Sequence, residues 1–214
     1  MELKLNEKKA AQTLNSYRIE YNAKPNLMAA TINNDNTLVI VIDMIVGFCV
    51  EGALSSSRAA NVIAPIRDLL LKLPKARKAF VRDCHEENAI EFKSFPPHCH
   101  NKLESALVKD LAEFLDIDVP KNSTNGFFAL RNIVNDLASY KNVVLVGVCT
   151  DICVLQLGLT LKAYFNEMNR DNNVIVFSSC VETYDSPLHD AELSNVMALK
   201  LLEQAGVIVY KGII

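Results

Sequence analysis

A cysteine in the setting of a nucleophile lies in the segment GVCTDICV, where a β-rich run turns directly into a helical pattern. The pattern places Cys153 in the first turn of a helix, with Thr150 as N-cap and Asp151 in the first turn. Unpaired N–H groups and the positive end of the helix dipole favour a thiolate there, and the same N–H groups could hold an oxyanion. Position alone leaves a buried helix cysteine as an equally good interpretation of Cys153. We expect Cys149, at the end of the strand, to contribute backbone rather than side-chain chemistry.

Asp43 and Lys121 follow two other strand-like runs and offer the charged groups that such a nucleophile needs. A carboxylate next to a thiol can accept its proton and pass it to a leaving amine, provided that burial raises the carboxylate pKa towards neutrality. An aspartate that closes an apolar strand is costly, which favours a functional Asp43 over a locally paired one. A nearby lysine would stabilise negative charge on the thiolate or on Asp43, although Lys121 taken by itself would be interpreted as a solvated loop lysine.

A second group of polar residues has the composition of a metal site. Asp83 and His85 follow one strand-like run, and His98 follows in FPPHCH. A carboxylate and two imidazoles suit Zn²⁺, and also Fe²⁺ or Mn²⁺, with positions left for water or substrate. His100 adjoins His98, but neighbours on an extended loop point apart, so we expect it at the surface. His189 begins a late helix, and we expect it to be structural or exposed.

The composition is that of one globular domain. Of 214 residues, 50% are hydrophobic and 22% are charged, and a net charge of −3 gives no reason to expect a nucleic-acid partner. The longest apolar stretch, residues 38–50, is interrupted by Asp43 and is too short to span a membrane, and the charged N-terminus lacks the apolar core of a secretory signal. We therefore expect a cytoplasmic protein with no membrane partner, whose six cysteines are reduced.

Short runs rich in Val and Ile alternate with helix-period segments along most of the chain. Strands are predicted at residues 38–43, 78–82, 143–148, 174–178 and 207–210, with a weaker one near 117–120. Helices are predicted at residues 58–73, 103–115, 130–140, 151–169 and 188–205. This alternation indicates an α/β fold, a three-layer α/β/α sandwich with a mainly parallel sheet of about six strands. The site of such a fold lies beyond the carboxyl ends of the strands, which is where the polar residues above are found.

The motif G-V-x-T-D-x-C-V around Cys153 resembles the nucleophile motif of the isochorismatase-like cysteine hydrolases, the nicotinamidases (pyrazinamidases) in particular. In that family an Asp after the first strand and a Lys after the third complete the triad. The resemblance assigns these roles to Asp43 in VIDMIVGF and to Lys121 in PKNSTNGFF. It also implies a Rossmann-like sheet and an oxyanion held by the backbone N–H groups of Cys149 and Cys153.

The resemblance covers residues 38–209, with the three motifs in the family's order. We therefore predict an isochorismatase-like hydrolase domain at residues 37–214 and an N-terminal helical extension at residues 1–36. Residues 5–21 of the extension are amphipathic and could pack on the domain or on a partner chain. We expect a homo-oligomer, whose size the sequence does not decide.

The same resemblance extends to the metal ligands and the substrate walls. It implies that a divalent metal, Zn in first place with Fe or Mn as alternatives, binds at Asp83, His85 and His98 and holds the pyridine nitrogen of the substrate. Members of the family vary in a fourth ligand; Glu91 has a fitting position, with Glu86 and Glu87 as competitors. Phe48 and Phe95 match the positions that sandwich the pyridine ring, and Phe128, with Phe127 beside it, is a further candidate for substrate binding.

The activity implied by the resemblance is hydrolysis of nicotinamide to nicotinate and ammonia through a Cys153 thioester, a step of pyridine nucleotide salvage in NAD biosynthesis. Three departures leave the amide substrate open. Residues 45–47 lack the polar side chains that many nicotinamidases carry after Asp43, and Cys149 replaces the usual alanine of a cis-peptide turn. Residues 101–104 also replace the Gly-Thr that often follows Pro-Pro-His-Cys. The alternatives are an isochorismatase-like hydrolase of another small amide, a ureido compound or a vinyl ether, and a non-catalytic isochorismatase-like binding module.

Overall fold

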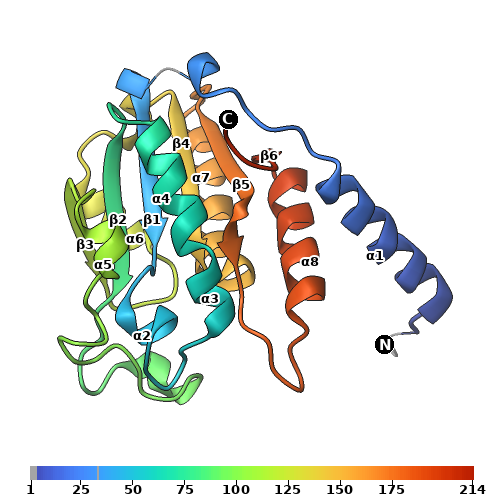
Figure 1. Cartoon of the computed structure of the whole chain (residues 1–214), viewed down its shortest axis with the longest axis horizontal. Coiled ribbons are helices and arrows are strands. Elements are labelled where there is room, and N and C mark those ends of the chain that lie inside the picture. Colours follow the sequence, from blue (N-terminus) through green and yellow to red (C-terminus); the bar gives the residue numbers. More distant parts are fainter. Residues whose placement is uncertain (1–3, 33) are drawn as a thin grey trace.

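The computed structural model describes residues 4–32 and 34–214. They form one six-stranded sheet with helices packed on it (Figure 1). The strand order is β3-β2-β1-β4-β5-β6, and every neighbouring pair is parallel. The strands are β1 (Thr37–Ile42), β2 (Arg77–Asp83), β3 (Ile117–Lys121), β4 (Asn142–Val148), β5 (Asn173–Glu182) and β6 (Ile208–Tyr210). The prediction of about six strands in a parallel α/β sandwich is confirmed.

Helices cover both faces of the sheet, which explains why the central strands are apolar throughout. Every residue of β1 and β4 is buried. Along β1, residues 38, 40 and 42 pack on one face and residues 39 and 41 on the other, as the alternation of a strand requires. The first face is covered by α6 (Phe127–Ile133), α7 (Leu155–Glu167) and α8 (Ala191–Gln204). The opposite face is covered by α2 (Val46–Cys49), α3 (Ser57–Asn61), α4 (Ile63–Lys72) and α5 (Lys109–Ala112). Among the described residues, no helix is long and apolar enough to cross a membrane.

The helix predicted over residues 58–73 is two helices, α3 and α4, which meet at Val62. Pro65 is the third residue of α4 and has no N–H to donate to the carbonyl of Asn61. A continuous helix would lose a hydrogen bond there, so the break comes just before the turn of α4 that contains Pro65.

The helix predicted over residues 103–115 is wrong for most of its length, because only α5 is helical within it. The Oδ1 atom of Asn101 accepts the N–H groups of Leu103 and Glu104 at 3.1 and 2.9 Å. This side-chain bonding holds the segment in a turn and competes with a helix, as asparagine often does.

The other predicted helices are present with shifted ends. In the region 130–140, α6 ends at Ile133 and only a short 3₁₀ turn, η4 (Leu137–Ser139), follows. A π-helical turn, η5 (Thr150–Val154), precedes α7. Asp190 sets the start of α8, because its side chain accepts the N–H of Leu193 at 2.8 Å.

The N-terminal extension contains the helix α1 (Glu7–Asn22), which lies alongside α8 (Figure 1). The Tyr21 hydroxyl donates to Glu203 Oε2 at 3.2 Å, and Lys200 Nζ is 3.3 Å from Glu20 Oε2. Lys24 also forms an ion pair with Glu203. Of the two placements that the sequence leaves open, α1 therefore takes the one on the domain. Residues 1–3 and 33 of the predicted extension lie outside the described residues, and the domain boundary at residue 37 stays a prediction.

The carboxyl ends of four neighbouring strands meet at one edge of the sheet. Asp43 directly follows β1, Asp83 ends β2, Lys121 ends β3 and Cys149 follows β4. Since these strands are adjacent and parallel, the sheet brings the four residues together from distant parts of the chain.

Candidate active site

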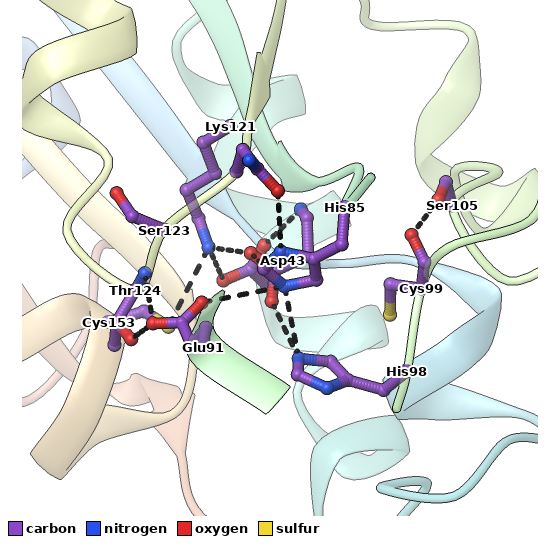
Figure 2. A network of polar contacts seen from close by, with 12 residues as sticks. Asp43, His85, Glu91, His98, Cys99, Ser105, Lys121, Ser123, Thr124 and Cys153 are labelled. Carbon is purple, nitrogen blue, oxygen red and sulfur yellow. Dashed lines mark hydrogen bonds and ion pairs between the residues drawn. The ribbon is translucent and has the colours of Figure 1, made fainter. Parts of the chain in front are cut away.

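Lys121 lies at the centre of a buried group of ionisable side chains at this edge (Figure 2). Its Nζ is 3.1 Å from Asp43 Oδ2 and 3.9 Å from Cys153 Sγ, and it donates a hydrogen bond to Asp83 Oδ1. Lys121 is paired with Asp83 in the register of β3 on β2, so the two side chains leave the sheet on the same side. The structure thus brings the three residues of the predicted triad together.

Two backbone hydrogen bonds orient the Asp43 carboxylate. Asp43 leaves β1 with a positive φ of 53°, and its N–H donates to Val81 O at 2.8 Å. Its Oδ1 accepts the N–H of Asp83, also at 2.8 Å. The other oxygen, Oδ2, therefore faces Lys121.

Burial changes the protonation of Asp43 and Cys153. Burial raises the pKa of Asp43 to about 6; the charge of Asp83 adds to this rise, while Lys121 and the Cys153 thiol oppose it. Burial also raises the pKa of the Cys153 thiol well above its usual value; Lys121 favours the thiolate, but the carboxylates of Asp43 and Asp83 disfavour it. Burial thus opposes the thiolate that the helix position favours. Cys153 rests as a thiol next to a carboxylate that can accept its proton.

The nucleophile turn is the π-helical segment η5, which joins β4 to α7 and contains Cys153. The carbonyl oxygen of Cys149 closes this turn, since it accepts the N–H groups of Ile152 and Val154, each at 3.1 Å. Single π-helical turns occur often at functional sites. Here the turn holds Cys153 at the cavity wall, with its side chain almost fully buried.

The start of this turn differs from the sequence prediction. Cys149, not Thr150, precedes the first helical residue, and the Thr150 hydroxyl is buried without a hydrogen-bond partner among the described residues. The Val148–Cys149 peptide bond is cis, at the position where the resemblance implies a cis-peptide turn. Cys149 and Cys153 line the same cavity, and their role as oxyanion donors stays a prediction.

Asp83, His85 and His98 direct their donor atoms at a common point, and all three are buried. The Nε2 atoms of His85 and His98 are 3.2 Å apart, and each of the two Asp83 oxygens is 3.5 Å from one of these nitrogens. Donors bound about 2.0–2.1 Å from a tetrahedral Zn²⁺ would lie roughly 3.3 Å from one another. The spacing of the three residues therefore fits a metal ion.

The opposite ring nitrogens of the two histidines are fixed by acceptors. His85 Nδ1 lies 3.2 Å from Asn122 Oδ1, and His98 Nδ1 lies 2.8 Å from Pro96 O. Asn122 Oδ1 also accepts the N–H of Glu86 at 3.1 Å, which identifies it as the carbonyl oxygen. Both Nδ1 atoms therefore carry a proton, and Nε2 of each ring is the nitrogen left for a cation, as in most histidine metal sites.

Glu91 lies beside this group of donors and not within it. Its Oε2 is 3.6 Å from His85 Nε2, while Oε1 accepts the N–H of Thr124 at 2.8 Å and the Thr124 hydroxyl (Figure 2). The group of possible metal ligands found among the described residues, Asp83, His85 and His98, does not include Glu91. Its competitors Glu86 and Glu87 are exposed, so Glu91 remains the predicted fourth ligand.

Two residues of the triad and two of the three candidate metal ligands line one cavity of about 220 Å³. Asp43 and Cys153 line it together with Asp83 and His98. Phe48 and Phe95 line it as well, with ring centroids 5.7 and 6.3 Å from that of His98. A cavity of this size, with apolar walls and a few converging polar groups, suits a small molecule.

Phe128 is not part of this cavity, so its prediction as a substrate-binding residue is wrong. Its side chain is 65% exposed, whereas Phe127 is buried with its ring 5.3 Å from that of Tyr164. Consecutive residues of a helix point in different directions. Because α6 turns Phe127 inwards, it turns Phe128 towards solvent.

Three residues in or next to the site escaped the sequence reasoning. Phe92 packs against His85 and His98, with centroid distances of 5.3 and 5.7 Å. Tyr184 and Asp185 line the cavity from the loop after β5. The rule about carboxyl ends of strands could have found these two, but the predicted strand stops at residue 178 whereas β5 continues to residue 182. His100 is exposed, as predicted.

The isochorismatase domain family matches residues 37–209 of this chain. The chain therefore belongs to the isochorismatase family and is an isochorismatase-like hydrolase. Nicotinamidase 1 from Arabidopsis thaliana is 27% identical over 209 residues, 85% of this chain and 85% of that protein.

Two solved structures share the fold. PnC1 from L. infantum in complex with nicotinate has a TM-score of 0.70 at 20% identity, over 86% of this chain and 98% of that one. Pyrazinamidase of Pyrococcus horikoshii in complex with zinc has a TM-score of 0.64 at 24% identity, over 82% of this chain and 99% of that one. The resemblance seen in the sequence motifs is thus confirmed at the level of family and fold.

Proposed function

We propose that this protein is a metal-dependent cysteine amidohydrolase that converts nicotinamide into nicotinate and ammonia. The observation that carries the proposal is one shared cavity: Cys153 and Asp43 line it with Asp83 and His98 of the possible metal ligands and with two phenylalanines. Supporting it are a relative named as a nicotinamidase and two structures of the same fold, one holding nicotinate and one zinc. The proposed role is pyridine nucleotide salvage in the cytoplasm, and the predicted homo-oligomer belongs to the same proposal.

In the first half-reaction, Cys153 Sγ attacks the carbonyl carbon of the amide, and the thiol proton passes to the Asp43 carboxylate. With a pKa of about 6, Asp43 is ionised at neutral pH and is still able to carry a proton. Lys121, 3.9 Å from Sγ, stabilises negative charge next to it. We assign the oxyanion to the backbone N–H groups of Cys149 and Cys153. The C–N bond then breaks, Asp43 protonates the departing nitrogen, and ammonia leaves a thioester on Cys153.

In the second half-reaction, a water molecule attacks the thioester carbonyl while Asp43 accepts one of its protons. The C–S bond breaks, and this proton returns to the Cys153 sulfur. The product is the carboxylic acid, which ionises to nicotinate at neutral pH. One water is consumed for each amide, and both groups return to their starting protonation.

The chemistry of the donor set fits the divalent metal that the family resemblance implies. Asp83, His85 and His98 would hold it, with Glu91 as the candidate fourth ligand; Zn²⁺ is the first choice and Fe²⁺ or Mn²⁺ the alternatives. When bound, the metal would supply a Lewis-acid position for the pyridine nitrogen of the substrate. Phe48 and Phe95 would hold the ring from its sides, so that its amide is presented to Cys153.

Ammonia release from nicotinamide, measured with zinc-loaded protein, tests this proposal. Cys153→Ala should remove the activity, whereas Cys180→Ala, a buried cysteine that does not line the cavity, should keep it. Mass spectrometry of acid-quenched enzyme should find the nicotinoyl group on Cys153. If zinc-, iron- and manganese-loaded protein all release no more ammonia than Cys153→Ala, nicotinamide is not the substrate.

A further inference from the structure

The loop that follows β5, residues 183–190, is tied to the nucleophile turn through the side chain of Asp151. The Thr183 hydroxyl donates to Asp151 Oδ1 at 2.6 Å, and His189 Nε2 lies 2.7 Å from Asp151 Oδ2. Thr183 is fully buried. Both oxygens of a carboxylate only two residues from Cys153 are therefore used to hold this loop.

The partners of His189 determine its charge. Nε2 faces a carboxylate oxygen, and Nδ1 faces the carbonyl oxygen of Tyr184 at 2.9 Å. Both partners are acceptors, so both ring nitrogens donate and His189 is an imidazolium. Burial opposes this charged form, but Asp151, the Tyr184 carbonyl and Asp185 outweigh it and raise the pKa of His189 above its usual 6.5. The ion pair with Asp151 is thus a charge-assisted hydrogen bond, which is stronger than a neutral one.

The same imidazolium fixes the ring of Tyr184. The two rings are stacked, with centroids 4.0 Å apart and planes 10° from parallel. A cation against an aromatic face is attracted to it. Ser186 and His189 also exchange two backbone hydrogen bonds of 3.0 Å, which close the loop into a tight turn. Tyr184 is consequently held from its own loop and, through His189, from the nucleophile turn.

Tyr184 lines the cavity together with Cys149 and Ile152 of the nucleophile turn. We propose that Asp151 and His189 are positioning residues that hold Tyr184 as the wall of the cavity, and that this wall limits the substrate to small carboxamides. The substrate part of this inference rests on the proposed amidohydrolase function. The wall itself does not, because it can be measured through the access of reagents to Cys153.

Alkylation of Cys153 by a small and a bulky reagent tests the wall without any turnover. Iodoacetamide and N-phenylmaleimide are compared on metal-loaded protein, with the adduct on Cys153 quantified by mass spectrometry. Tyr184→Ala, His189→Ala and Asp151→Ala should each raise the maleimide rate relative to the iodoacetamide rate by about tenfold, the usual effect of a few carbon atoms in a pocket. His100→Ala, an exposed histidine, should leave the ratio unchanged. An unchanged ratio in all three of these variants overturns the proposal.

Asp151→Asn separates positioning from general stability. Its amide can accept from Thr183 and donate to a neutral His189, so it keeps the hydrogen bonds and loses only the charge; its ratio should lie between wild type and Asp151→Ala. Kinetics give the second readout: the Asp151→Ala and His189→Ala variants should raise the KM for nicotinamide about tenfold and change kcat less. Tyr184→Ala should shift kcat/KM towards 5-methylnicotinamide by about tenfold.

The two proposals fail in different ways. If wild type hydrolyses no nicotinamide but the alkylation ratios change as stated, the positioning of Tyr184 is supported and nicotinamide is rejected as the substrate. If wild type is active and neither the alkylation ratios nor KM respond to His189→Ala and Asp151→Ala, the proposed function is supported and the positioning role of the two residues is rejected. Should His189→Ala fail to fold, Tyr184→Ala and Asp151→Asn give the same comparison.

Discussion

The Nε2 atoms of His85 and His98 face each other at 3.2 Å inside the protein. Each ring donates its Nδ1 proton elsewhere, so the two facing nitrogens are the ones available to a cation. We predict that His85→Ala and His98→Ala each lower metal affinity by at least about 100-fold, since even outer partners of metal ligands contribute 10–100-fold. Metal content after dialysis, measured by elemental analysis, is the readout. His100→Ala is the matched control, and equal metal loss in that variant would argue against a specific site.

Asn122 should influence the metal site without touching the metal. Its Oδ1 is the acceptor for His85 Nδ1 and keeps that ring in the tautomer that offers Nε2. We predict that Asn122→Ala lowers metal affinity by about 10–100-fold, whereas Asn122→Asp, which retains an acceptor oxygen, loses less. Competition with a chromogenic chelator measures both. Equal affinities for wild type and Asn122→Ala would show that His85 does not need this partner.

Lys121 should matter for stability as well as for activity. It is the cation between the buried carboxylates of Asp43 and Asp83, and removing one partner of a buried ion pair leaves uncompensated charge. We predict that Lys121→Met lowers the free energy of unfolding by about 3–5 kcal/mol, measured by urea denaturation at neutral pH. The exposed Lys102→Met should change it by less than about 0.5 kcal/mol. Adding Asp43→Asn should restore part of the loss; if it does not, the two side chains are not coupled.

Phe48 and Phe128 are both predicted to bind the substrate, but the structure places them differently, and this suggests a paired test. Phe48 lines the cavity whereas Phe128 is exposed. Phe48→Leu keeps most of the side-chain volume but removes the flat face, so we predict a rise of about tenfold in the KM for nicotinamide. Phe128→Leu should leave KM and kcat at wild-type values. Similar KM values for both variants would mean that Phe48 does not hold the ring.

Much of the site could be predicted because strand ends are readable in a sequence. Asp43, Asp83 and Lys121 each end or follow an apolar run, and parallel strands place such ends at one edge. The direction of a side chain on a helix is harder to predict. The predicted helix begins at residue 130, whereas α6 begins at Phe127, so the sequence does not show that Phe128 lies on the solvent side of a helix.

Interactions that depend on burial and on loop shape could not be predicted from the sequence. The protonation of Cys153 reverses once its burial is known, because burial disfavours a thiolate more strongly than Lys121 favours it. The pairing of Asp151 with His189 depends on the length of β5 and on the turn between Ser186 and His189. Neither has a periodic pattern, so each histidine and aspartate could only be given its most common role.

The attachment of α1 to α8 should depend on pH through Glu203. Burial alone would raise the pKa of Glu203, but hydrogen bonds from Lys24 and Lys200 outweigh it and lower the pKa below its usual 4.5. A lowered pKa means that the carboxylate stabilises the fold above pH 4.5 and that this contribution is lost as the pH falls through the folded value. We predict that Glu203→Gln lowers the free energy of unfolding by about 1 kcal/mol at pH 7 and by less at pH 3. Urea denaturation at both pH values measures this, with the exposed Glu167→Gln as control. A loss of the same size at both pH values would mean that Glu203 acts through packing, since the contribution of the ionised carboxylate decreases as the pH falls.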